Sequence, residues 1–146
     1  MPHLHTLVCL CAVSSSAAWA QAQPGQWEVR VTLQGAPSGG GTTVQTACLA
    51  ADRMAAAPEQ ALLDVAGTSP NKDRPSLRCT VKDVQRGQGK SAWQSSCEGP
   101  RGAMPGQGSA TIDAQSAELV QSFEVKTPMG TRSLQQTVRA KRVADC

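Results

Sequence analysis

The chain has 146 residues and a formal net charge of +3, which fits one domain of modest size. Only 3% of its residues are aromatic, so a core would bury little apolar area, and we expect disulfides to help stabilise it. The basic residues are scattered, and the densest group (Arg139, Lys141 and Arg142) is typical of solvent-facing strand residues, which argues against a nucleic-acid-binding face.

Residues 1–20 have the pattern of a cleaved secretory signal peptide. An apolar run at 7–13 is followed by small residues and by Ala18-Trp19-Ala20, which matches the cleavage pattern of such peptides. The run is too short to span a membrane. We therefore expect cleavage after Ala20 and a periplasmic or secreted domain, residues 21–146, without a transmembrane segment. Cys9 and Cys11 leave lipidation open, and the absence of Lys and Arg from the first residues leaves a misplaced start codon open.

Two strands are predicted next. Residues 26–35 alternate, with Trp27, Val29, Val31 and Leu33 on one side and polar residues on the other. A glycine-rich loop then leads to a second strand at 42–49. This pattern is typical of antiparallel strands with one face buried.

The pattern changes to a helical one from Ala50 to Gly67. The segment is rich in alanine and lacks β-branched residues before Val65. We expect Asp52 to cap a first short helix, and Pro58 to occupy the first turn of a second helix that ends at Gly67.

Strand patterning returns at Leu77. Residues 77–84 and 91–97 flank a flexible hairpin tip, and a Gly/Pro-rich connection is expected at 98–108. Three further strands are predicted at 109–114, 117–127 and 132–143. The expected fold is therefore mostly β: a single antiparallel meander of about seven strands, curved or barrel-like, with one short helical insertion.

Four cysteines remain after residue 20, and they allow three pairings. A hairpin turn centred near Gln88 places Cys79 opposite Cys97, within disulfide range, which leaves Cys48 for Cys146. A register slip of one residue would put Cys79 and Cys97 on opposite faces. Zinc is disfavoured as an alternative because the four cysteines form no close pair and both histidines, His3 and His5, lie in the signal peptide.

The segments "PGQWEV", "TACL", the "C…W…C.G" hairpin, "GQGSATI" and "KRVADC" follow one another along the chain. In this order they resemble the family of small exported bacterial proteins labelled domain of unknown function 3617. The resemblance covers residues 21–146, although Ala144 stands where the family usually has Gly, and the usual Thr-Pro after the first cysteine is absent. It implies an exported location and no assigned activity.

No catalytic residue, metal ligand or cofactor is predicted. Gly89-Lys90-Ser91 resembles the end of a phosphate-binding loop, but Val84 stands where that loop requires glycine. Glu28 and Glu124 are a formal acid–base pair that nothing distinguishes from surface charge. Trp27 and Trp93 are expected to face inward, where they either fill the core or line an apolar cavity.

These patterns predict an exported, non-enzymatic domain that binds an unidentified envelope protein or another envelope component. The alternative is a carrier that holds a small apolar ligand within the curved sheet, between Trp27, Trp93 and Phe123. A hydrolase is the third hypothesis, and neither the partner nor the oligomeric state follows from the sequence.

Overall fold

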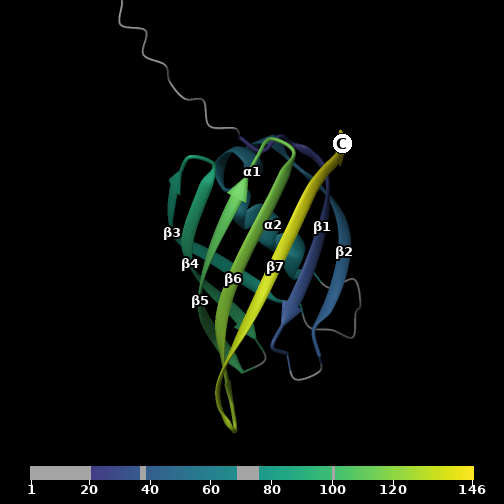
Figure 1. Ribbon diagram of the computed structural model, residues 1–146. Coiled ribbons are helices and arrows are strands. Elements are labelled where there is room, and N and C mark those ends of the chain that lie inside the picture. Colours follow the sequence, from purple (N-terminus) through teal and green to yellow (C-terminus); the bar gives the residue numbers. More distant parts are fainter. Residues whose placement is uncertain (1–20, 37–38, 69–75, 100) are drawn as a thin grey trace, which may run out of the picture.

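The computed structural model describes residues 21–36, 39–68, 76–99 and 101–146, and the predicted signal peptide lies outside them. The described chain forms seven strands and two helices (Figure 1). In chain order these are β1 (Gly25–Gln34), β2 (Gly41–Leu49), α1 (Ala51–Ala56), α2 (Pro58–Gly67), β3 (Arg78–Gly87), β4 (Lys90–Gly99), β5 (Gly102–Ile112), β6 (Ser116–Thr127) and β7 (Gly130–Ala144).

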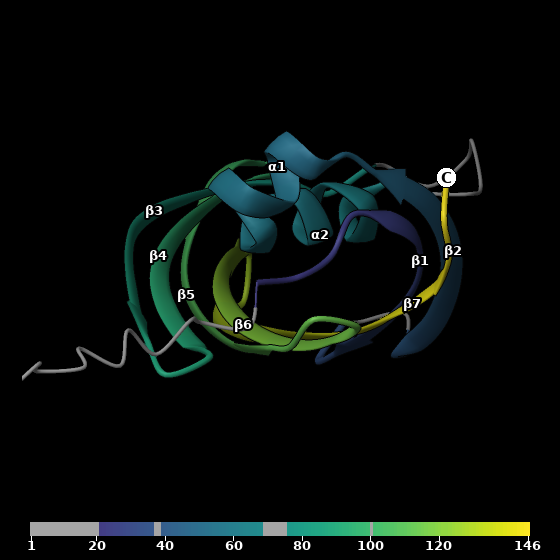
Figure 2. The ribbon, with the colours of Figure 1, turned by 90° about the horizontal axis from the view of Figure 1, so that it is seen from above.

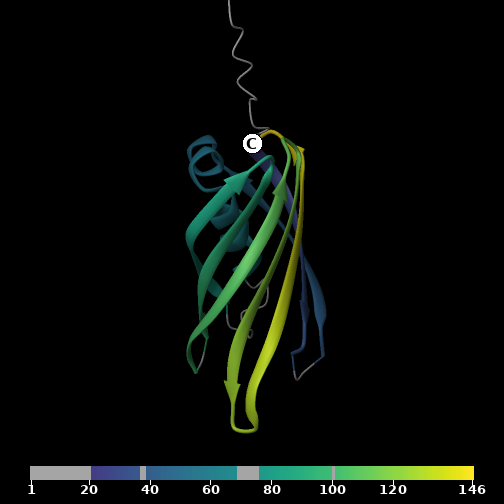
Figure 3. The same cartoon turned by 60° about the vertical axis from the view of Figure 1, so that its left-hand side comes forward.

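All seven strands belong to one antiparallel sheet in the order β2-β1-β7-β6-β5-β4-β3. The sheet is curved without closing, and α1 and α2 lie across the opening between its margins, β2 and β3 (Figure 2). The β6–β7 hairpin reaches beyond the other strands at the end away from α1 (Figure 3). The predicted meander is confirmed, with one departure from simple succession: β1 lies between β2 and β7.

The Gly/Pro-rich segment predicted as a connection is largely strand, because β5 begins at Gly102. Glycine normally weakens a strand, but it also marks places where other atoms approach the backbone closely. A Cβ at Gly108 would lie 2.4 Å from the Trp93 ring, and one at Gly106 would lie 2.9 Å from the Ser95 hydroxyl. The Trp93 ring therefore occupies the space that Gly108 leaves free, and at Gly106 the Ser122 carbonyl of β6 approaches as well, to 2.5 Å from such a Cβ.

The β3–β4 hairpin has a tighter tip than the sequence suggested. Its strands run to Gly87 and Lys90, and the turn consists of Gln88 and Gly89, both with positive φ (55° and 70°). Counting back from this turn without irregularity would place Cys79 opposite Glu98. A bulge after Lys82 shifts the register by one residue, and Cys79 therefore faces Cys97.

Both helices lie where the sequence predicts them, but the predicted N-cap of α1 is not observed. Pro58 occupies the start of α2, as predicted, and Gly67 is its last residue. The predicted cap on α1 is wrong: Ala50 is the N-cap residue and offers no side-chain hydrogen bond, whereas Asp52 lies in the first turn. A negative charge there still interacts favourably with the positive end of the helix.

Glutamine side chains connect α2 to both margins of the sheet. Gln60 donates to the Cys79 carbonyl and accepts from the Val81 N–H, each at 2.8 Å. On the other margin Gln45 of β2 donates to the carbonyls of Val65 and Thr68. The Gln60 amide thus satisfies the backbone groups of β3 that a neighbouring strand would otherwise satisfy.

Both predicted disulfides, Cys48–Cys146 and Cys79–Cys97, are present. Near the first, the two ends of the described chain meet, because Arg142 donates from Nε to the Pro24 carbonyl at 2.7 Å and pairs with Asp145. The Arg142 side chain is only 20% exposed, so the expectation that it faces solvent is wrong. Its guanidinium is held by the segment preceding β1, and "PGQW" and "KRVADC" are in direct contact.

Candidate functional site

The aromatic residues Trp27, Trp93 and Phe123 all lie on the inner face, with 0%, 3% and 2% of their surface exposed. They do not gather in one place. Trp27 and Trp93 pack with Leu62 and Leu63 of α2 in the larger apolar cluster, whereas Phe123 packs with the Cys79–Cys97 disulfide in a second one. Helix α2 therefore fills much of the space that a ligand between these aromatics would need.

Buried polar side chains cross the interior between these clusters. Gln121 and Gln136 are opposite each other in β6 and β7, and Gln121 donates from Nε2 to Oε1 of Gln136 at 2.8 Å. Among the described residues, Oε1 of Gln121 and Nε1 of Trp93 have no hydrogen-bond partner. The inner face is consequently filled and partly polar.

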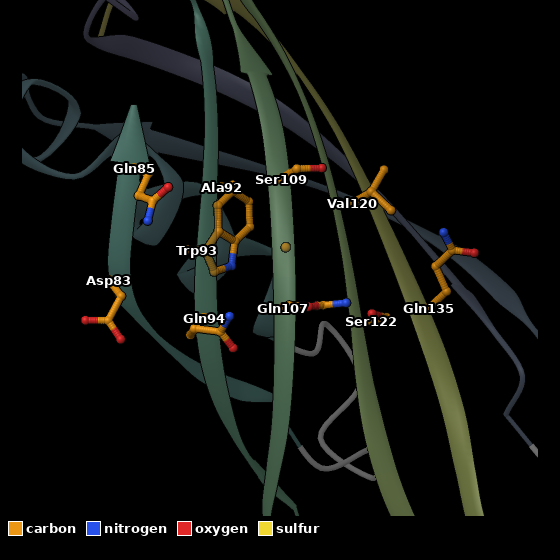
Figure 4. Close-up of a pocket in the computed structure, with 11 residues that line it drawn as sticks. Asp83, Gln85, Ala92, Trp93, Gln94, Gln107, Ser109, Val120, Ser122 and Gln135 are labelled. Atoms are coloured by element: carbon orange, nitrogen blue, oxygen red, sulfur yellow. The ribbon is translucent and has the colours of Figure 1, made fainter. Parts of the chain in front are cut away.

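A cleft of about 460 Å³ lies on the outer face of the sheet, over β3 to β7 (Figure 4). It follows from strand register, because Gln94, Gln107, Ser122 and Gln135 are successive partners across β4, β5, β6 and β7. The remaining lining consists mainly of small or polar residues: Asp83, Gln85, Ala92, Trp93, Gly108, Ser109 and Val120. We refer to this cleft as the outer groove.

The outer groove is built for hydrogen bonding to uncharged groups. A glutamine amide both donates and accepts, and a serine hydroxyl does the same. Asp83 is the one charged side chain of the lining, and it projects from the β3 bulge where φ is 52°. With no basic residue in its lining, the groove offers a polyanion no favourable charge.

No sequence pattern marks the groove glutamines as functional. Each occupies an exposed position of an alternating strand, the usual place for a solvated polar residue. The alignment of Gln94, Gln107 and Gln135 arises only when the four strands β4 to β7 adopt their mutual register.

A buried carboxylate at the start of α2 is the other unusual group. Glu59 is 2% exposed in its side chain and accepts from Arg86 of β3 at both oxygens, at 3.0 and 2.7 Å. Burial alone would raise the pKa of Glu59, but its hydrogen bonds, led by those from Arg86, and the positive charge lower it below the ordinary value. A smaller cleft of about 190 Å³ adjoins the pair. Because Arg86 occupies both oxygens, the pair's evident role is to fasten α2 to β3.

The other groups considered from sequence do not assemble into a catalytic arrangement. Glu28 is in register with Lys141 and through it with Ser116, whereas Glu124 lies eight residues further along β6, about 26 Å at the rise of a strand. Within the described ranges, no three His, Cys, Asp or Glu residues are grouped to hold a metal ion. None of the described helices is long and apolar enough to cross a membrane.

Together the fold and these clefts define a disulfide-linked protein built on one curved antiparallel sheet, with helices across its opening and a polar groove on its outer face. The chain belongs to the family described as Protein of unknown function (DUF3617), whose model matches residues 22–146. Neither the curated proteins nor the solved structures give a significant match.

Proposed function

We propose that residues 21–146 form a non-enzymatic binding domain outside the cytoplasm, and that the outer groove holds an uncharged part of an envelope component, rich in hydroxyl or amide groups. The observation that carries this proposal is the groove itself: about 460 Å³ on the outer face, lined by amides and hydroxyls. Glycan strands have the matching chemistry, since their hydroxyls also both donate and accept.

Location outside the cytoplasm is supported by two independent features. Disulfides persist in oxidising compartments, and this chain has two. The A-x-A pattern at Ala18-Trp19-Ala20 predicts export and cleavage. Amino-terminal sequencing of protein from the periplasmic fraction should begin at Gln21, and full-length protein confined to the cytoplasm would contradict export.

The binding proposal is tested by sedimentation with purified peptidoglycan sacculi. The native domain should co-sediment, and the double variant Gln94→Ala, Gln107→Ala should lose most of the bound fraction. Thr46→Ala is the matched control, because Thr46 is exposed on the outer face of β2, away from the groove. Equal sedimentation of the native domain and the double variant would exclude the groove as the binding surface.

The carrier alternative receives less support from the interior. Half-buried apolar side chains surround the second cluster, but Trp27 and Phe123 are packed in separate places and Gln121 and Gln136 lie between. The role of Trp27, Trp93 and Phe123 as ligand-lining residues stays a prediction. Native mass spectrometry of protein taken from the periplasm would reverse this preference if it showed a bound apolar molecule. Turnover in a hydrolase panel, lost on changing one residue, would instead revive the enzyme hypothesis.

A further inference from the structure

The sheet contains a split between β5 and β6. Their pairing extends from Gly106–Ile112 on β5 to Ala117–Phe123 on β6, and there it stops. Residues 102–105 of β5 remain strand but pair only with β4, while residues 124–127 of β6 pair only with β7 (Figures 1 and 3). Two strand segments thus each leave one edge without a neighbouring strand.

The backbone explains why pairing ends there. In an antiparallel ladder, alternate residues direct both their N–H and C=O groups to the same neighbour. Asp113 donates to the Ser116 carbonyl, so the odd-numbered residues of β5 and the even-numbered residues of β6 face each other. The next rung would join Pro105 to Glu124, but proline has no N–H to donate.

The split holds a cleft of about 360 Å³ with two chemically different sides. Met104 and Val125 line its inner side and are half-buried against the cluster around Phe123. Glu124 and Lys126 are exposed on the outer side. The backbone groups of these last two residues point away from β7 and into the cleft.

We propose that this split binds an extended polypeptide, which adds as a strand to the free edge of β6 at residues 124–127. The occupant follows from the unpaired groups: N–H and C=O of Glu124 and Lys126 repeat every second residue, and an extended backbone matches that repeat. Pro105 makes β5 the poorer edge. No residue of this site lines the outer groove, so the inference does not rest on the proposed function.

The two sides of the cleft also define the sequence that fits. Successive side chains of an added strand point to opposite faces. Those that point inward meet Met104 and Val125, and we expect them to be apolar and of moderate size. Those that point outward lie beside Glu124 and Lys126, and we expect them to be polar.

The probe is a capped heptapeptide, TVEVTVS, titrated into the oxidised domain while amide hydrogen exchange is measured. Binding should slow exchange at Glu124 and Lys126 at least tenfold. A peptide N-methylated at every second residue should lose binding when the methyl groups fall on the paired edge and keep it when they fall on the other. If both N-methylated peptides bind like the unmodified one, backbone pairing is excluded.

A variant pair tests the same edge from the protein side. Lys126→Pro removes an N–H directed into the cleft and should weaken binding at least tenfold, whereas Lys126→Ala keeps it and should change binding less than twofold. The reverse order would overturn the proposal. If Lys126→Pro does not fold, the N-methylated peptides decide alone.

Two controls separate this site from the alternatives. Gln107→Ala in the outer groove should leave peptide binding intact. Protection of the Glu124 and Lys126 amides that rises with protein concentration in the absence of peptide would assign the edge to a second copy and overturn the proposal.

Discussion

The sheet has two openings, and they are treated differently. The opening between β2 and β3 is spanned by α2, whose Gln60 occupies the backbone groups of β3 and whose Glu59 holds Arg86. The split between β5 and β6 has no such bridge within the described part of the chain, and Pro105 limits its closure. An edge can therefore be satisfied by side chains as well as by a strand, and the split without a bridge leaves strand edges available to a partner.

The largest expected effect concerns β2, one margin of the bridged opening. The double variant Cys48→Ser, Cys146→Ser removes a link between residues 98 apart. Chain entropy predicts a loss of about 4 kcal/mol in the free energy of unfolding. Urea unfolding of the variant and of the native domain measures the difference, and a loss below about 1 kcal/mol would show that α2 holds this margin without the disulfide.

Arg86→Ala should have the next largest effect. It leaves the Glu59 carboxylate buried without its cation, and we expect a loss of about 2 kcal/mol, less than for a fully buried pair because the Arg86 side chain is 48% exposed. Thermal unfolding at neutral pH measures it. Arg30→Ala is the control, since Arg30 is exposed and its Glu28 partner is 4.0 Å away.

The same pair predicts a pH dependence. The pKa of Glu59 is lower in the folded protein than its ordinary value of 4.5, so its contribution is complete above that value and is lost as the pH falls through the folded pKa. The free energy of unfolding should therefore fall less steeply from neutral to acidic pH in Glu59→Gln than in the native domain. Parallel curves would mean that Glu59 contributes nothing to acid lability.

Gln60→Met tests the side-chain substitute for a strand. It leaves the Cys79 carbonyl and the Val81 N–H unpaired at a part-buried edge, and we expect a loss of about 1–2 kcal/mol. Hydrogen exchange at Val81 should quicken as well. The same change at the exposed Gln34 provides the comparison, and equal stability of the two variants would argue against the bridge.

Pro105→Val should have the smallest effect and an opposite sign. It restores an N–H opposite Glu124, and one additional rung is worth about 0.5–1 kcal/mol. Exchange at Glu124 should slow, and binding of the peptide probe should weaken because the split narrows. An unchanged Glu124 exchange rate would show that proline is not what ends the pairing.

Much of this architecture follows from local pattern. Alternation from Trp27 to Leu33 predicted β1 and its buried face, and the change of period after Ala50 predicted the helices. The two disulfides followed because one hairpin placed Cys79 near Cys97. Pattern fails at β5, since Gly106 and Gly108 disfavour a strand locally, whereas the close approach of β6 at Gly106 and of the Trp93 ring at Gly108 leaves room for glycine alone.

The candidate sites were less accessible to sequence reasoning because they depend on register. The sequence predicts a hairpin centred near Gln88, whereas the turn is centred half a residue further on and the bulge at Asp83 compensates. Likewise, Gln94, Gln107 and Gln135 are ordinary exposed residues until their strands align. The alternation of residues within a single strand does not determine how neighbouring strands align.

The position of β1 has a consequence for folding order. Its second neighbour is β7, whose 15 residues come last in the described chain. Strands β1 and β6 therefore each lack one of their two neighbouring strands until β7 pairs with them. Long-range pairing of this kind is slow and leaves strand edges exposed to aggregation. Assembly of the sheet can therefore finish only once β7 is available, and the Cys48–Cys146 bond links β2 to the segment that follows β7.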